Sequence, residues 1–87
     1  MPLSMLKVGD SAVVSAIKGN DSTKKHLENL GFVANAQITV VSVNGGDMIV
    51  KVMESKIALG KDMTTKIIVT RLLGYSHHLH RLYTAIR

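Results

Sequence analysis

The stretch that decides the fold is residues 27–43, which read LENLGFVANAQITVVSV. Its start closes a short helix predicted over residues 23–30, since Leu27 and Leu30 share one helical face among polar neighbours. Gly31 stands where helices commonly end on a residue with positive φ. Residues 36–43 then alternate apolar and polar side chains as a β-strand does. The stretch therefore predicts a helix followed directly by a strand.

The alternation within residues 36–43 changes phase in the middle of the strand. Ile38 and Val40 share one parity, whereas Val41 and Val43 share the other. A strand that changes its buried face midway usually carries a bulge or a bend, as strands of small closed barrels do. The sequence therefore predicts a bent strand at this point.

Short strands separated by turn residues account for most of the remaining chain. Asn-Gly-Gly-Asp at residues 44–47 predicts a tight hairpin, because Asn and Gly accept positive φ. Asp62 is expected to cap a single helical turn over residues 63–66. The other predicted strands are residues 11–18, 48–53, 56–59 and 67–70. Five short strands and one short helix predict a mainly β domain, built as a small antiparallel β-barrel that closes to remove exposed edges.

The composition of the 87 residues indicates one domain in a reducing compartment. Cysteine is absent, 46% of the residues are hydrophobic and only 3% are aromatic. A secreted domain of this size often needs disulfides, so their absence favours the cytoplasm. No secretion signal is recognised at the start, and no apolar run approaches the ~20 residues of a membrane span. We therefore expect a cytoplasmic protein without a direct membrane span.

The net charge of +5 raises the question of nucleic-acid binding. The eight lysines are scattered, however, and only Lys24 and Lys25 are adjacent. Nucleic-acid binders cluster their charge, and single-strand binders stack bases on aromatic side chains, which this chain almost lacks. We expect no nucleic-acid partner, and a nucleic-acid-binding small barrel stays as an alternative.

No set of residues predicts catalysis. Before residue 74 the sequence holds one histidine, His26, and no acidic residue is spaced to orient it. Gly45 and Gly46 are followed by a strand rather than a helix, so they do not form a phosphate-binding loop. We therefore predict a protein that is not an enzyme and that has no catalytic residue and no cofactor.

The last residues differ in character from the rest. Residues 1–73 are predicted to form the barrel domain, and residues 74–87 a C-terminal tail that is flexible, weakly helical or expression-derived. His77, His78 and His80 lie within four residues, and such imidazoles can bind a divalent metal ion. Because the sequence supplies no rigid scaffold or supporting shell there, adventitious metal binding is only a weak alternative to no metal site.

Four segments, in this order and spacing, resemble the FeoA family over residues 3–73. The early one is residues 7–17, from Lys-Val-Gly-Asp to Val-Val-Ser-Ala-Ile. The central one is Leu-Glu-Asn-Leu-Gly-Phe-Val at residues 27–33 with Ile-Thr-Val-Val at residues 38–41. The later ones are Ile-Val-Lys-Val at residues 49–52 and Lys-Ile-Ala-Leu-Gly-Lys-Asp-Met at residues 56–63.

The chain departs from the family pattern at two places. The family's Pro-Gly pair is replaced by Ala34-Asn35, and its Met-Ala pair by Met63-Thr64. Asn is the residue other than glycine that best tolerates a left-handed conformation, so the turn at Asn35 is expected to survive.

The resemblance implies an SH3-like barrel that acts as a binding or regulatory module. FeoA proteins are cytoplasmic accessories of bacterial ferrous iron transport, and the implied partner is the FeoB-type membrane GTPase transporter. FeoA-like modules also occur in metal-dependent repressors of the DtxR type, which is an alternative setting. Because a few apolar side chains dominate small interfaces, we expect the helix, its following turn and two methionines to bind the partner. The residues are Leu27, Leu30, Gly31, Phe32, Met48 and Met53.

Overall fold

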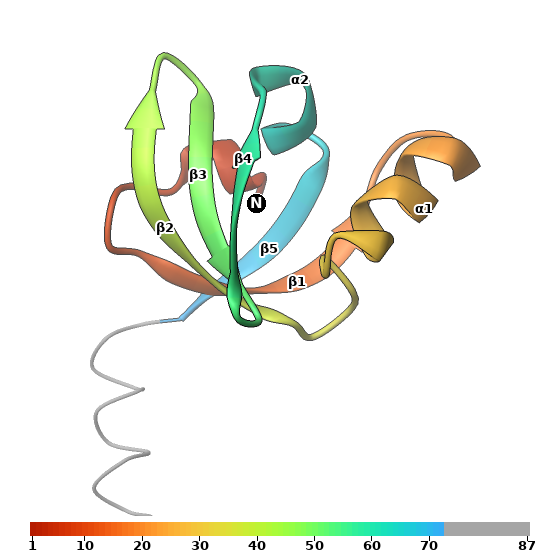
Figure 1. Ribbon diagram of the computed structural model, residues 1–87, viewed down its shortest axis with the longest axis horizontal. Coiled ribbons are helices and arrows are strands. Elements are labelled where there is room, and N and C mark those ends of the chain that lie inside the picture. Colours follow the sequence, from red (N-terminus) through yellow and green to blue (C-terminus); the bar gives the residue numbers. More distant parts are fainter. Residues whose placement is uncertain (73–87) are drawn as a thin grey trace, which may run out of the picture.

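Five antiparallel strands form one sheet that curls into a small barrel, with α1 (Asp21–Asn29) projecting beside it (Figure 1). The computed structural model describes residues 1–72, so the predicted tail and its boundary lie outside the described residues. The strand order is β4-β3-β2-β1-β5. The other elements are η1 (Leu3–Met5), β1 (Ser11–Ile17), β2 (Gln37–Asn44), β3 (Asp47–Val52), β4 (Ser55–Leu59), α2 (Lys61–Thr64) and β5 (Ile67–Leu72).

The core is aliphatic, apart from Phe32, and fills the inside of the curled sheet. Inward side chains alternate along each strand, as in Met48, Val50 and Val52 of β3. The predicted bulge in β2 is confirmed, because its register with β3 shifts between Val40 and Ser42, but Val41 and Val43 are exposed and form no second buried face. The buried apolar residues are Leu3, Leu6, Ala12, Val14, Leu27, Phe32, Ile38, Val40, Met48, Val50, Val52, Leu59, Ile67 and Val69.

Helix α1 begins two residues before the predicted start, because Asn20 caps it. The Asn20 side-chain oxygen accepts a hydrogen bond from the Thr23 backbone N–H at 2.8 Å. At the other end Gly31 has φ of +113°, which confirms the predicted positive φ. The Phe32 backbone N–H donates to the Leu27 carbonyl at 3.0 Å, and the side chain of Phe32 is fully buried.

Helix α2 occupies residues 61–64, so the predicted single helical turn is present but begins two residues earlier than the predicted 63–66, and the predicted cap by Asp62 is wrong. The N-cap is Gly60, and Asp62 lies inside the first turn. The Lys61 backbone N–H instead donates to Asp47 Oδ1 at 2.9 Å. Asp47 belongs to the β2–β3 hairpin. The first backbone N–H of α2 is therefore hydrogen-bonded by a residue fourteen positions earlier in the sequence.

Thr64 fastens α2 to the same hairpin. Its side chain is fully buried, and its hydroxyl lies 3.0 Å from the Gly46 carbonyl and 3.2 Å from the Lys61 carbonyl. The hydroxyl can donate to either oxygen, so a buried polar group is satisfied where the family pattern has alanine. Thr64 therefore holds the β2–β3 turn against the short helix.

An exposed ion pair ties the turn before β1 to β5. Arg71 donates to Asp10 Oδ1 at 3.1 Å, and the Lys7 backbone N–H donates to Asp10 Oδ2 at 2.8 Å. The Lys7 backbone hydrogen bond is the main cause that lowers the pKa of Asp10 below its ordinary 3.8; desolvation opposes it, and the hydrogen bond and charge of Arg71 lower the pKa further. Asp10 therefore stabilises the fold in its charged form.

We predict that Thr64→Val lowers the free energy of unfolding by about 1–2 kcal/mol, because the isosteric side chain cannot donate to Gly46. Thr65→Val is the matched control, since the exposed Thr65 hydroxyl bonds only the Asp62 carbonyl. Denaturant unfolding of both variants measures the difference. Equal stability of the two variants would contradict a role for the Thr64 hydrogen bond.

We predict that Asp10→Asn lowers the midpoint of thermal unfolding at neutral pH and has no effect in strong acid. The folded pKa of Asp10 is depressed, so its contribution is complete above the unfolded value and is lost as the pH falls through the folded one. Melting curves of the wild type and the variant should therefore converge below pH 3.8. A constant difference across this range would show that the charge of Asp10 does not matter.

Candidate protein-binding site

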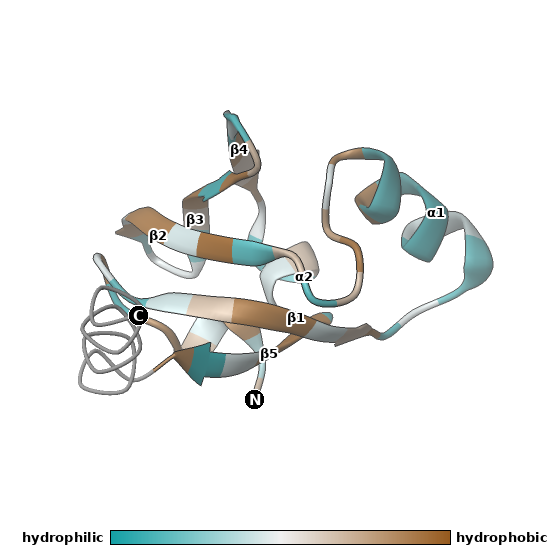
Figure 2. Ribbon diagram, turned by 90° about the horizontal axis from the view of Figure 1, so that it is seen from below, coloured by the Kyte–Doolittle hydropathy of each residue, from teal (hydrophilic) through white to brown (hydrophobic). Residues whose placement is uncertain are grey.

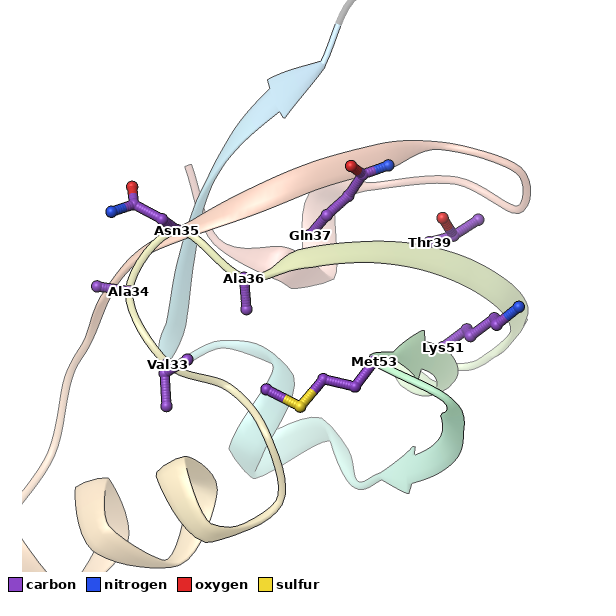
Figure 3. Close-up of a pocket in the computed structure, with 8 residues that line it drawn as sticks. All are labelled: Val33, Ala34, Asn35, Ala36, Gln37, Thr39, Lys51 and Met53. Atoms are coloured by element: carbon purple, nitrogen blue, oxygen red, sulfur yellow. The ribbon is translucent and has the colours of Figure 1, made fainter.

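An open groove of about 520 Å³ lies between the α1–β2 turn, the start of β2 and the end of β3 (Figure 3). The side chain of Met53 extends toward Val33 and Ala36, whereas Lys51 extends the other way. The lining therefore combines an apolar half with a polar half that holds one cation and no acid. The lining residues are Val33, Ala34, Asn35, Ala36, Gln37, Thr39, Lys51 and Met53.

Met53 has an unfavourable backbone conformation and an exposed side chain in the apolar half of the groove. It is the first residue of the two-residue turn between β3 and β4, where its φ is +57°. Such turns favour glycine at positions of positive φ, and a side chain there costs roughly 1–2 kcal/mol. Met53 is nevertheless 63% exposed. Packing in the core therefore does not explain why methionine occupies this position.

The backbone beneath the groove is shaped by two residues with positive φ. Gly31 is buried with φ of +113°, and a Cβ placed on it would lie 3.6 Å from Met53 Sδ. Asn35 has φ of +71°, which confirms the expected left-handed turn in place of the family's Pro-Gly. The Asn35 backbone N–H donates to the Val14 carbonyl at 2.8 Å, so this turn is fastened to β1.

The structure divides the six predicted partner-binding residues by exposure. Gly31 and the side chains of Leu27, Phe32 and Met48 are buried, so they lie in the core rather than on the surface. Leu30 is partly buried against the core, and the side chain of Met53 is exposed. Direct contact of any of the six with a partner stays a prediction.

Of the eight lining residues only Met53 was among the predicted ones, and Val33 and Lys51 are two of the seven that were missed. Val33 is 38% exposed directly after the buried Phe32, and Lys51 lies two residues before Met53 on the outer face of β3. The period of two along β3 already placed Lys51 and Met53 on one face. No signal in the sequence placed Val33 opposite them, because that depends on how the α1–β2 turn folds back.

Metal binding finds no support in the part of the chain that the structure describes. Within residues 1–72 no three His, Cys, Asp or Glu side chains are grouped so that they could hold an ion. His77, His78 and His80 lie outside the described residues. Separately, none of the helices in residues 1–72 has the length and apolar character needed to cross a bilayer.

Comparisons with solved structures find several similar chains. A crystal structure of an iron uptake regulatory protein (FeoA) is 29% identical, with a TM-score of 0.78, over 83% of this chain and 97% of that one. FeoA of Stenotrophomonas maltophilia complexed with zinc, described as an SH3 domain protein, is 30% identical, with a TM-score of 0.71, over 80% and 89%. FeoA from Chlorobium tepidum is 26% identical, with a TM-score of 0.77, over 85% and 72%.

Metal-dependent repressors share the fold as well. A manganese-dependent transcriptional repressor is 18% identical, with a TM-score of 0.76, and this chain covers 36% of it. At that identity the likeness shows the fold alone. None of the curated protein sequences matches the chain.

The fold is therefore an SH3-like barrel that is mainly β with short helices. Residues 1–71 match the FeoA domain family, which is associated with ferrous iron transport. This match covers most of the 87 residues. The chain belongs to the FeoA family.

Proposed function

We propose that this protein is a cytoplasmic accessory of bacterial ferrous iron transport and that it acts by binding a FeoB-type membrane GTPase transporter. The contact surface is the groove between the α1–β2 turn and the end of β3. The protein carries out no chemistry of its own. It regulates or assembles the transporter through this contact.

The observation that carries the proposal is the exposed, conformationally strained Met53 in the groove. Strained backbone conformations persist when something other than local stability selects them, and they concentrate at binding sites. Methionine is flexible and polarizable, so it adapts to an apolar partner surface. Met53 with Val33 beside it offers an apolar anchor, and Lys51 offers a charged rim.

The family supports the identity of the partner. The S. maltophilia relative is described as a candidate activating factor for ferrous iron transport. An activating factor without catalytic groups must contact the transport machinery. The likeness to repressors shows the fold alone and does not favour the alternative of a repressor module.

We predict that Met53→Asp weakens binding to the cytoplasmic portion of the FeoB-type transporter by at least about tenfold, because a charge would replace the central apolar anchor. Met5→Asp is the matched control, since Met5 is equally exposed, at 65%, and does not line the groove. Titration calorimetry compares the two variants with the wild type. Iron uptake by a deletion strain that expresses each variant should follow the same order. An absence of binding by the wild type would refute the proposed function.

We predict that Met53→Asn does not lower the free energy of unfolding and raises it by up to about 1 kcal/mol, because Asn tolerates positive φ better than Met does. Denaturant unfolding measures the change, with Met5→Asn as the control. A loss of more than about 1 kcal/mol would show that Met53 is kept for packing on Gly31 rather than for binding.

A further inference from the structure

The two edges of the curled sheet differ in what covers them. The outer edge of β5 is paired with the start of the chain, since the Val69 backbone N–H donates to the Met1 carbonyl at 2.7 Å and Pro2 bridges Ile68. Strand β4 pairs only with β3, and within residues 1–72 no other group is hydrogen-bonded to its backbone. Figure 2 shows β4 at the end of the sheet, with α1 standing apart from it. Strand β4 is therefore the open edge.

The turn before β4 determines which backbone groups face this open edge. Val52 and Ser55 are directly opposite each other across a two-residue turn, so they form a hydrogen-bonded pair. Because such pairs alternate along an antiparallel ladder, Ile57 and Leu59 also direct their backbone groups to β3. The N–H and C=O groups of Lys56 and Ala58 therefore point away from the sheet.

Two rows of outward side chains end at these residues. Thr39, Lys51 and Lys56 lie opposite one another across β2, β3 and β4 and form the first row. The second row is Ser42, Ile49 and Ala58. A strand added beside β4 would extend both rows, with one side chain opposite Lys56 and another, two residues away, opposite Ala58.

A negatively charged side chain on the added strand would complement the first row. Like charges directly opposite each other on neighbouring strands destabilise a sheet, and Lys51 and Lys56 are such a pair. The one ion pair in residues 1–72 joins Asp10 and Arg71, so no carboxylate within these residues neutralises the two lysines. A carboxylate opposite Lys56 would remove this repulsion.

An apolar side chain on the added strand would complement the second row. Ile49 is 39% exposed, and Ala58 lies beside it on the outer face. Both line an open hollow of about 340 Å³ together with Ser42 and Leu59. An aliphatic side chain opposite Ala58 would enter this hollow and cover Ile49.

We propose that the partner adds an extended segment to β4 as a sixth strand, with a carboxylate side chain facing Lys56 and an aliphatic one, two residues away, facing Ala58. The added main-chain hydrogen bonds supply affinity, and the two side chains supply specificity. A lysine on an open edge disfavours pairing with a second copy of the same strand. This inference rests on the proposed function, since it gives the chemistry of the segment that the transporter contributes.

Amide hydrogen exchange of the full chain tests the proposal. In the free protein the Lys56 and Ala58 amides should exchange fast, whereas those of Ile57 and Leu59 exchange slowly. On binding the cytoplasmic portion of the FeoB-type transporter, exchange at Lys56 and Ala58 should slow by at least about tenfold. Binding without this protection would overturn the sixth strand and leave the proposed function intact.

Two pairs of variants test the contribution of the main-chain hydrogen bonds and that of the lysine charge separately. Ala58→Pro removes only an outward N–H, which an edge strand tolerates, and should weaken binding at least about tenfold, whereas Ala58→Thr should not. Lys56→Glu should weaken binding to a similar extent, and Lys25→Glu on α1 is the control with the same change of charge. Equal affinities of each variant and its control would overturn the proposal.

A peptide experiment tests strand addition to β4 independently of whether the transporter binds. The probes are Thr-Thr-Glu-Thr-Val-Thr-Thr with blocked ends and the same peptide with Lys in place of Glu. We expect the glutamate peptide to protect the Lys56 and Ala58 amides and the lysine peptide to leave them unprotected. Equal effects, or no protection by either peptide, would overturn the proposed strand chemistry. A failure of the transporter alone would refute only the proposed function.

Discussion

Burial of Phe32 beneath the end of α1 is the constraint on which the rest of the structure depends. Phe32 is the largest fully buried side chain, in a core that is otherwise aliphatic. It reaches the core only because Gly31 reverses the chain with φ of +113° directly after the helix. That reversal also brings Val33 and the Asn35 turn against the end of β3. The groove is therefore a consequence of how the core is completed.

The sequence predicted those features that depend on neighbouring residues. The helix around Leu27, the positive φ of Gly31 and Asn35, and the bulge after Val40 follow from local patterns, and the structure confirms them. The bounds of α2 were wrong because Asp47, which is distant in the sequence, bonds to its first N–H. The candidate site was predictable only in part, since Met53 was among the expected partner-binding residues whereas the position of Val33 depends on tertiary packing.

The groove and the open edge of β4 are two parts of one surface. Lys51 lines the groove, and it also lies directly opposite Lys56 across β3 and β4. An extended segment beside β4 would therefore be separated from the groove-lining Lys51 of β3 by one strand, β4. The apolar anchor at Met53 and the lysine pair can engage a single partner, because the short β3–β4 hairpin carries both. A contact of this kind would combine main-chain pairing with one apolar anchor.

Two locally unfavourable features lie in the same hairpin. Met53 has a conformation that favours glycine, and Lys51 and Lys56 place like charges opposite each other. Other parts of residues 1–72 follow local preferences: Asn20 caps α1, glycines occupy the Asn-Gly-Gly-Asp turn, the positive φ of Asn35 falls on a residue that tolerates it, and no buried side-chain polar atom lacks a partner. In most proteins the local preferences of the residues agree with the fold, and the exceptions occur mainly at functional sites. A binding partner that covers Met53 and neutralises the lysines gives both departures one physical cause.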